Sequence, residues 1–200
     1  MESKGIISSE TLDTLGQYGS ILSGHPTIEV PGIEVNTGAL GHGLSIGVGM
    51  ALAAKMNHQS YKTYVLMGDG EQGEGSIYEA AMAAHQYKLD NLVAIIDRNR
   101  LQISGTTEEV MAIEDIYQRW TALGWDVKHM NGDDIEDIVH CFSEIDFESK
   151  RPHLLISHTT KGKGVSYMEN VTKWHHGVPN QEEFDLAIKE ISERIATLEK

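Results

Sequence analysis

The apolar residues of this chain fall into short continuous runs and into longer segments with helical spacing. Two of the runs, Tyr64–Met67 and Leu92–Ile96, flank the segment Ser76–Tyr87, which is rich in the strong helix formers Ala, Met and Glu. A short apolar run between turn residues is typical of a buried strand. The order therefore predicts a strand, a glycine-rich turn, a helix and a second, parallel strand, which together make one right-handed βαβ unit.

The rest of the chain continues this alternation. Apolar runs predict further strands at 125–130 and 154–159, and helical spacing predicts helices at 113–123, 133–145 and 180–198. The last helix has an apolar stripe, which we expect to close the core. Strands that alternate with helices indicate an α/β fold of three layers around a doubly wound, mainly parallel sheet. Because no internal repeat, linker or low-complexity segment is visible, residues 1–200 are expected to form a single domain.

Polar side chains follow both strands of the βαβ unit. Asp69 lies in the sequence GDGE directly after the first run, and Asn99 follows the second. The carboxyl ends of neighbouring parallel strands lie about 5 Å apart at one sheet edge, where ligands of open α/β sheets bind. Carboxylate and amide oxygens suit Mg²⁺ or Ca²⁺ rather than Zn²⁺, and glycines let the backbone approach phosphates. A metal-bridged diphosphate would use all these features; the alternative is an ordinary glycine-rich turn and an Asn at a strand end.

Three other segments carry candidate chemistry. His25 lies in a loop between Gly and Pro, where a single His is otherwise a solvated side chain. Lys161 and Lys163 alternate with glycines after a predicted strand, where they could contact a phosphate. The alternative is that both are solvated surface lysines. His175 and His176 are adjacent, and adjacent histidines rarely converge on one metal; no Cys or third His lies nearby at zinc spacing.

Composition narrows the classes of function. A net charge of −14 argues against nucleic-acid binding, because neutralisation of phosphates by Lys and Arg supplies most of that affinity. No apolar run approaches the ~18 residues that a membrane span needs, and no signal peptide is visible, so we expect a soluble protein. The single cysteine excludes an internal disulfide, which fits the reducing cytoplasm.

A GDG sequence followed about thirty residues later by an Asn after an apolar run resembles the thiamine-diphosphate motif. The match continues along nearly all of the chain, and in order the matching segments resemble a transketolase. The likeness is greatest to the N-terminal half of transketolases that are encoded as two separate chains. The segments are GHP at 24–26, PGIEVNTGALGHGLSIGVGMALAAK at 31–55, KLDNLVAIIDRNRLQISG at 88–105, KGKG at 161–164 and KWHHGVPN at 173–180.

The resemblance implies a thiamine-diphosphate-binding fold, the diphosphate-binding domain of the family, and a set of site residues. Asp69, Asn99 and the carbonyl of Leu101 would hold Mg²⁺ or Ca²⁺. His25 and His176 would be catalytic, with His25 assisting proton transfers on the substrate. In the family, the loop equivalent to residues 36–43 touches the aminopyrimidine half of the cofactor through its backbone. The implied cofactor-binding residues are Gly38, Leu40, Gly68, Asp69, Gly70, Glu71, Asn99 and His176.

The implied function is that of the N-terminal subunit of a cytoplasmic transketolase, which moves a two-carbon ketol unit between sugar phosphates in the pentose phosphate pathway. In the family, the Glu that activates thiamine belongs to a pyrimidine-binding domain. We therefore expect a C-terminal partner subunit that carries this domain, no activity without it, and a homo-oligomer.

The chain departs from the family in two places. The several dozen residues that usually come first, with their active-site histidines, have no counterpart here, so the chain is either truncated or a minimal natural version. The family often has Gln where this chain has His42, which either donates a hydrogen bond or merely packs.

Two other readings remain open. One is another thiamine-diphosphate enzyme, of the deoxyxylulose-phosphate synthase or 2-oxo-acid dehydrogenase type, although the GHP, GALGHG and KWHHG segments fit a transketolase better. The other is a non-catalytic, truncated chain that still binds thiamine diphosphate.

Overall fold

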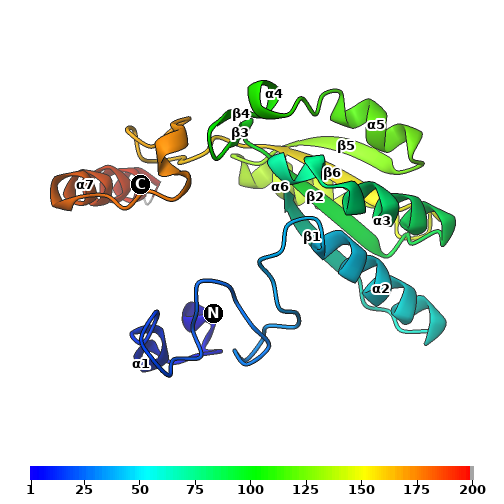
Figure 1. Ribbon diagram of the computed structural model, residues 1–200, viewed down its shortest axis with the longest axis horizontal. Helices are drawn as coiled ribbons and strands as arrows, with labels where there is room; N and C mark the ends of the chain where they lie inside the picture. Colours follow the sequence, from blue (N-terminus) through cyan, green and yellow to red (C-terminus); the bar gives the residue numbers. More distant parts are fainter. Residues whose placement is uncertain (199–200) are drawn as a thin grey trace. The chain divides into compact units, whose positions relative to one another are not determined.

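The computed structural model describes residues 1–198, and its centre is a four-stranded, entirely parallel sheet (Figure 1). The strands lie in the order β1-β2-β6-β5. Their bounds are Thr63–Gly68 for β1, Leu92–Arg98 for β2, Asp126–Asn131 for β5 and His153–His158 for β6. Parallel pairing places the carboxyl ends of all four strands at one edge of the sheet, as the βαβ pattern predicts.

Helices cover both faces of this sheet, which confirms the three-layer, doubly wound α/β fold (Figure 1). One face packs against α2 (Gly43–Met56), α3 (Gly75–Gln86) and α5 (Ile116–Ala122), and the other packs against α6 (Ile135–Ser143). The larger core cluster includes Leu44, Ile77, Trp120, Trp125 and Ile156, and the smaller one includes Val93, Met130, Cys141, Ile145 and Leu155.

The two strands of the βαβ unit differ in burial. Strand β2 is almost continuously apolar because it lies inside the sheet and is covered on both faces. Strand β1 is at the edge and alternates: Val65 and Met67 are buried beneath α2 and α3, whereas Tyr64 and Leu66 on the opposite face are 52% and 72% exposed.

Short elements follow β1 and β2 and shape the sheet edge. A 3₁₀ turn, η2 (Gly70–Gly73), leads from β1 into α3. After β2 the chain forms a hairpin of β3 (Leu101–Gln102) and β4 (Gly105–Thr106), which pairs antiparallel and leads into α4 (Thr107–Val110). A capping box between Thr106 and Glu109 stabilises the start of α4.

The C-terminal segment contains η3 (Thr172–His175) and α7 (Gln181–Leu198). Helix α7 forms where the apolar spacing predicts it, but its stripe of Phe184, Ile188, Ile191 and Ile195 is exposed and lies outside both core clusters. The expectation that this stripe closes the core is therefore wrong. The helix is held instead at a neighbouring strip of its surface, where Ala187 is buried and the Ser166 hydroxyl donates to Glu190 Oε1 (2.5 Å).

The chain divides into two compact units, residues 1–40 and residues 41–200. The first has little regular structure, with η1 (Glu2–Lys4) and the single helical turn α1 (Ser9–Leu12), whose N-cap Ser8 accepts from the backbone N–H of Thr11. The expectation of one domain over residues 1–200 stays a prediction. None of the helices in the described part of the chain is long and apolar enough to cross a membrane.

Candidate functional site

Asp69 and Asn99 lie at the carboxyl edge of the sheet, directly after neighbouring strands. Gly68, the last residue of β1, is paired with Asp97 of β2, so the residues that follow each strand emerge side by side. Asp97 also organises this edge, because its carboxylate accepts from the side-chain amide of Asn99 (3.2 Å) and from the hydroxyl of Thr159 after β6. The sequence-based placement of the two residues at one edge is thus confirmed.

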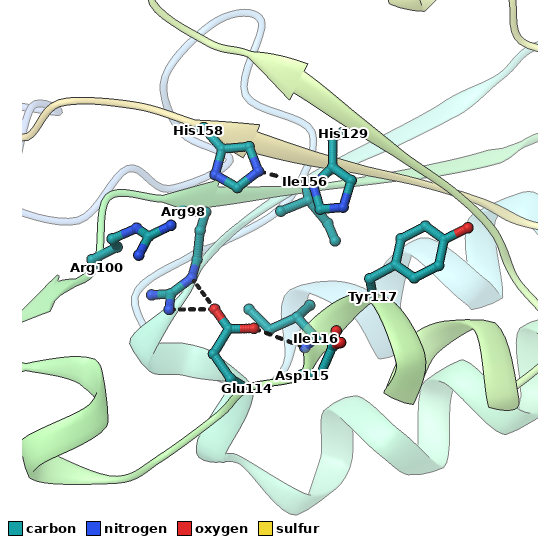
Figure 2. A pocket seen from close by; sticks show the side chains of 9 residues that line it. All are labelled: Arg98, Arg100, Glu114, Asp115, Ile116, Tyr117, His129, Ile156 and His158. Atoms are coloured by element: carbon teal, nitrogen blue, oxygen red, sulfur yellow. Dashed lines mark hydrogen bonds and ion pairs between the residues drawn. The ribbon is translucent and has the colours of Figure 1, made fainter.

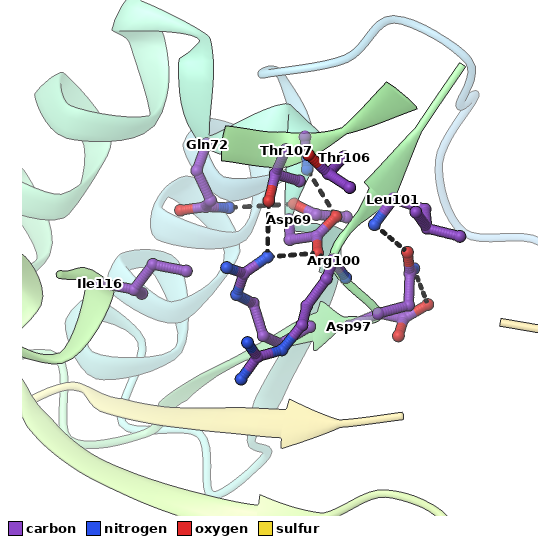
Figure 3. A network of polar contacts seen from close by, with 12 residues as sticks. Asp69, Gln72, Asp97, Arg100, Leu101, Thr106, Thr107 and Ile116 are labelled. Carbon is purple, nitrogen blue, oxygen red and sulfur yellow. Dashed lines mark hydrogen bonds and ion pairs between the residues drawn. The ribbon is translucent and has the colours of Figure 1, made fainter. Parts of the chain in front are cut away.

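The Asp69 carboxylate is buried, and hydrogen bonds from its own chain hold it in place (Figure 3). Only 2% of the residue is exposed. Its Oδ1 accepts from the N–H of Gly70 (2.8 Å), and its Oδ2 accepts from the N–H of Arg100 (2.6 Å) and from Nη1 of Arg98 (3.0 Å). These contacts hold the carboxylate in one orientation between the ends of β1 and β2.

Arg98 is the counter-charge of Asp69, and the sequence analysis did not identify it. The residue ends β2 and is 2% exposed, yet its guanidinium also contacts Glu114 (2.6 Å), Thr107 (2.8 Å) and Glu108 (3.3 Å). Burial alone disfavours the charged guanidinium, but the hydrogen bonds and charges of Glu114 and Asp69 outweigh it and raise the pKa of Arg98. Burial also acts to raise the pKa of Glu114. The hydrogen bonds that Glu114 accepts, led by the one from Arg98, and the charge of Arg98 outweigh this effect, so the pKa of Glu114 is lowered overall.

Asn99 and Leu101 form a tight turn after β2. The side-chain carbonyl of Asn99 accepts from the backbone N–H of Leu101 (3.0 Å), which turns the chain into the β3–β4 hairpin. A carboxylate or amide oxygen has about two acceptor positions, so Asp69 Oδ1 and Asn99 Oδ1 each retain one. The donor set of carboxylate, amide and backbone oxygens fits a hard divalent cation, although Arg98 supplies a competing positive charge.

The turn at Gly68–Gly70 is held by carboxylates of the chain itself. Glu71 Oε2 accepts from the N–H of Gly68 (3.1 Å), and its Oε1 accepts from the N–H of Gly41 (2.8 Å). At Gly70, an added Cβ would lie 3.0 Å from Oε1 and 3.1 Å from Cβ of Gln102, so the Gln102 side chain would have to shift. Gly70 therefore allows the close packing of η2 on the hairpin after β2.

His176 directly follows η3 and is exposed. The η3 segment contacts β3, so the structure brings the KWHHG segment beside Leu101 and Gln102. Partial burial, followed by the charges of Lys161 and His176, lowers the pKa of His175. Lys163 Nζ lies 3.7 Å from Asp133 Oδ2 and forms an ion pair with it at the surface. A phosphate contact of Lys161 or Lys163 stays a prediction.

His25, Gly38 and Leu40 belong to the first unit, residues 1–40. The ring of His25 packs directly on the Gly38 backbone, where a Cβ would overlap it, and Gly38 has a φ of 124° that few other residues adopt. Leu40 is exposed. The structure thus brings together two of the predicted site residues within this unit.

A pocket of about 320 Å³ opens at the same sheet edge on the α5 side (Figure 2). The rings of Tyr117, His129 and His158 stack in a row along it, and Nδ1 of His129 lies 2.9 Å from Nε2 of His158. Burial, followed by the charges of His129, Arg100 and Arg98, lowers the pKa of His158. The sequence analysis missed both histidines, although His158 ends β6, a position typical of ligand-facing residues in parallel sheets.

Comparison with known proteins adds a family to this geometry. Residues 6–193 match the family model described as the transketolase, thiamine diphosphate binding domain. The chain is 75% identical to one subunit of the apulose-4-phosphate transketolase of Phocaeicola vulgatus over all of its 200 residues, which cover 71% of that protein. The protein of the same name in Actinobacillus succinogenes is 45% identical to the chain over 190 residues. This match covers 94% of the chain and 68% of that relative.

Solved structures agree with this match. The transketolase of Campylobacter jejuni superposes with a TM-score of 0.85 and 35% identity, over 92% of this chain and 30% of that one. A transketolase from Leishmania mexicana gives a TM-score of 0.77 with 27% identity, over 95% of this chain and 33% of that one. This chain therefore spans about a third of the solved transketolases that it matches. These matches confirm the resemblance seen in the sequence, including that to subunits of split transketolases.

Proposed function

The chain belongs to the transketolase family, and on that premise we propose that it is the thiamine-diphosphate-binding subunit of a two-chain transketolase. The observation that carries the proposal is the position of Asp69 and Asn99, which follow neighbouring parallel strands at one sheet edge. The Oδ1 atom of each side chain accepts one hydrogen bond and can accept or coordinate one more partner. A divalent cation held by these two side chains and the carbonyl of Leu101 would tie a diphosphate to this edge.

The remaining site residues would bind and orient the cofactor. We assign diphosphate contacts to the turn Gly68–Gly70 and to His176, which lies in an exposed segment beside the β3–β4 hairpin. Gly38 and Leu40 would contact the aminopyrimidine half through their backbone. Glu71 would support the cofactor through the backbone N–H groups of Gly41 and Gly68, which its carboxylate holds. Bound thiamine diphosphate supplies the nucleophilic carbon for ketol transfer. His25 and His176 would hold or move protons on the substrate.

The similarity to subunits that act on a named sugar phosphate suggests a substrate class. Two relatives, at 75% and 45% identity, are named for apulose 4-phosphate, and another, at 38%, is named for 6-deoxy-6-sulfo-D-fructose. We therefore propose that the donor is apulose 4-phosphate or a similar ketose phosphate. These names favour a specialised sugar pathway over the pentose phosphate pathway.

A partner chain follows from the same relatives, because each is named as one subunit of a transketolase and a subunit requires at least one other. We propose that the partner carries the pyrimidine-binding domain and the carboxylate that activates thiamine, and that the assembled enzyme contains more than one copy of each chain. A cytoplasmic location is supported by the single, buried Cys141, which suits a reducing compartment.

Calorimetric titration of thiamine diphosphate with Mg²⁺, on this chain with its partner subunit, tests the proposal. We expect cofactor binding that requires the cation, and ketol transfer from apulose 4-phosphate only when both subunits are present. Cofactor binding that does not depend on a divalent cation would contradict the proposed site. Ketol transfer by the purified chain alone, after contaminating host enzyme has been excluded, would contradict the division of the active site between two subunits.

A further inference from the structure

The backbone of Gly41 is held from both sides by residues far away in the sequence. Its N–H donates to Glu71 Oε1 (2.8 Å), and its carbonyl accepts from the Ser76 hydroxyl (2.7 Å). The other carboxylate oxygen of Glu71 accepts from the N–H of Gly68 (3.1 Å). One side chain therefore ties Gly41, two residues before α2, to the end of β1.

The packing around Gly41 leaves no room for a side chain. Gly41 is buried and has a φ of 79°, in the left-handed region that favours glycine. A Cβ at this position would lie 2.7 Å from the Ser76 hydroxyl and 2.8 Å from Cβ of Glu74. Only a glycine can bring its backbone this close to the start of α3, so the two hydrogen bonds and the sterics together define one orientation of the backbone.

We propose that Glu71 and Ser76 are positioning residues, which hold the Gly41 backbone so that the loop segment at residues 41–43, directly before and at the start of α2, is presented to the aminopyrimidine half of thiamine diphosphate. This inference rests on the proposed function, which assigns the loop that ends in this segment to the cofactor. Glu71 acts through the backbone of Gly41 and Gly68, whereas Asp69, two residues earlier, serves the metal and the diphosphate.

The physical reason is preorganisation. A hydrogen bond to an ionised acceptor is shorter and about twice as strong as one between neutral groups, so a carboxylate that receives two backbone N–H groups holds them firmly. A loop held in its binding geometry loses less conformational freedom when the ligand arrives. Loss of the Glu71 carboxylate should leave the sheet edge in place and release the loop beside it.

Amide hydrogen exchange on the chain itself tests the contact. In Glu71→Ala the Gly41 amide should exchange at least about tenfold faster, because its acceptor is gone. Glu71→Gln keeps a carbonyl oxygen for Gly41, so its exchange should stay close to that of the wild type. Glu136→Gln, an exposed residue of α6 on the other face of the sheet, is the matched control and should change nothing. Unchanged exchange in Glu71→Ala would overturn the proposal.

Ligand binding then separates the two ends of the cofactor. Each variant, assembled with the partner subunit, is titrated with thiamine diphosphate and with inorganic pyrophosphate, both with Mg²⁺. Ser76→Ala, which leaves the hydrogen bond of Gly68 in place, should bind thiamine diphosphate about tenfold more weakly and pyrophosphate as well as the wild type does. Glu71→Ala, which also frees the N–H of Gly68, should lose more affinity for thiamine diphosphate than for pyrophosphate. Equal losses for both probes would place Glu71 at the diphosphate and overturn its positioning role. A wild-type complex that binds neither probe would contradict the proposed function instead, and the exchange rate of Gly41 would still decide whether Glu71 holds the loop.

Discussion

Asp69 and Glu71 are two carboxylates only two residues apart, and they differ in burial and in the charge of their partners. Asp69 is 2% exposed and is paired with a buried cation, Arg98. Glu71 is half-buried and contacts the neutral N–H groups of Gly41 and Gly68. A fully buried charge is costly unless an opposite charge and hydrogen bonds compensate it, whereas a half-buried one is stabilised by backbone dipoles and water.

The difference separates two kinds of role. Because Asp69 is part of a buried ion pair, its replacement changes the stability of the fold as well as any metal site. Glu71 can be replaced at a smaller cost in stability, so its effect on the cofactor can be measured by itself. Four substitutions or pairs of substitutions and one pH dependence test this comparison, in decreasing order of expected effect.

Asp69→Ala should have the largest effect. It leaves the Arg98 guanidinium buried without one of its partners, and removal of one member of a buried ion pair costs about 3–5 kcal/mol in free energy of unfolding. Because Glu114 and Glu108 still contact Arg98, we expect a loss of about 3 kcal/mol, measured by urea denaturation. Cofactor binding that depends on Mg²⁺ should be lost as well. A variant that is as stable as the wild type would show that the ion pair contributes nothing to folding.

The double variant Asp69→Asn with Arg98→Met separates the two roles of Asp69. Replacement of both members of a buried ion pair by uncharged side chains is often neutral or stabilising, so most of the lost stability should return. Cofactor binding should not return, because Asn lacks the charge of the metal ligand. Recovery of cofactor affinity together with stability would mean that Asp69 acts only through Arg98, and it would remove Asp69 from the proposed metal site.

Gly41→Ala should cost about 2 kcal/mol in free energy of unfolding, because a Cβ there overlaps the Ser76 hydroxyl and the φ of 79° strains any other residue. Gly49→Ala is the matched control. Gly49 lies inside α2 with open space around it, so alanine should stabilise the helix by about 0.5–1 kcal/mol. Thermal denaturation of the two variants should therefore show shifts of opposite sign. A harmless Gly41→Ala would mean that the loop adjusts freely.

Glu71→Ala should lower the free energy of unfolding by about 1–2 kcal/mol, which is typical for a hydrogen-bonded group that is only half-buried. This loss is smaller than that of Asp69→Ala because the N–H groups of Gly41 and Gly68 carry no net charge. Denaturation of both variants in the same buffer gives the ranking directly. A loss for Glu71→Ala that equals or exceeds the loss for Asp69→Ala would reverse the comparison.

The smallest effect should be a pH dependence from His158 in the pocket beside Arg98. Its folded pKa is lower than that of an exposed histidine, so the unfolded chain binds the proton more readily. The stability that His158 contributes is thus complete above about pH 6.5, and it is lost as the pH falls through the folded pKa. His158→Gln should flatten the stability profile over this range, and the exposed His140→Gln should not. An unchanged profile in His158→Gln would assign the slope to other groups.

Much of the sheet edge could be predicted because it depends on local pattern. The runs at Tyr64–Met67 and Leu92–Ile96 and the helix between them define a right-handed βαβ unit, and parallel strands must end at the same edge. That Asp69 and Asn99 lie together there follows from this geometry alone. The segment at 180–198 shows the limit of the same reasoning. Its spacing correctly predicts a helix, but an apolar stripe does not say whether another surface covers it.

What the tertiary structure alone decided is which distant side chain meets each of these residues. Arginine is by its type a surface residue, but Arg98 is buried because the register Gly68↔Asp97 brings the end of β2 alongside Asp69. Glu71 reaches Gly41 across 30 positions, and His129 meets His158 across 29. The spacing of apolar residues specifies individual helices and strands, because it depends only on residues close together in the sequence. Contacts between loops depend instead on the register of the strands and on the path of the chain after each one, and no short stretch of sequence contains that information.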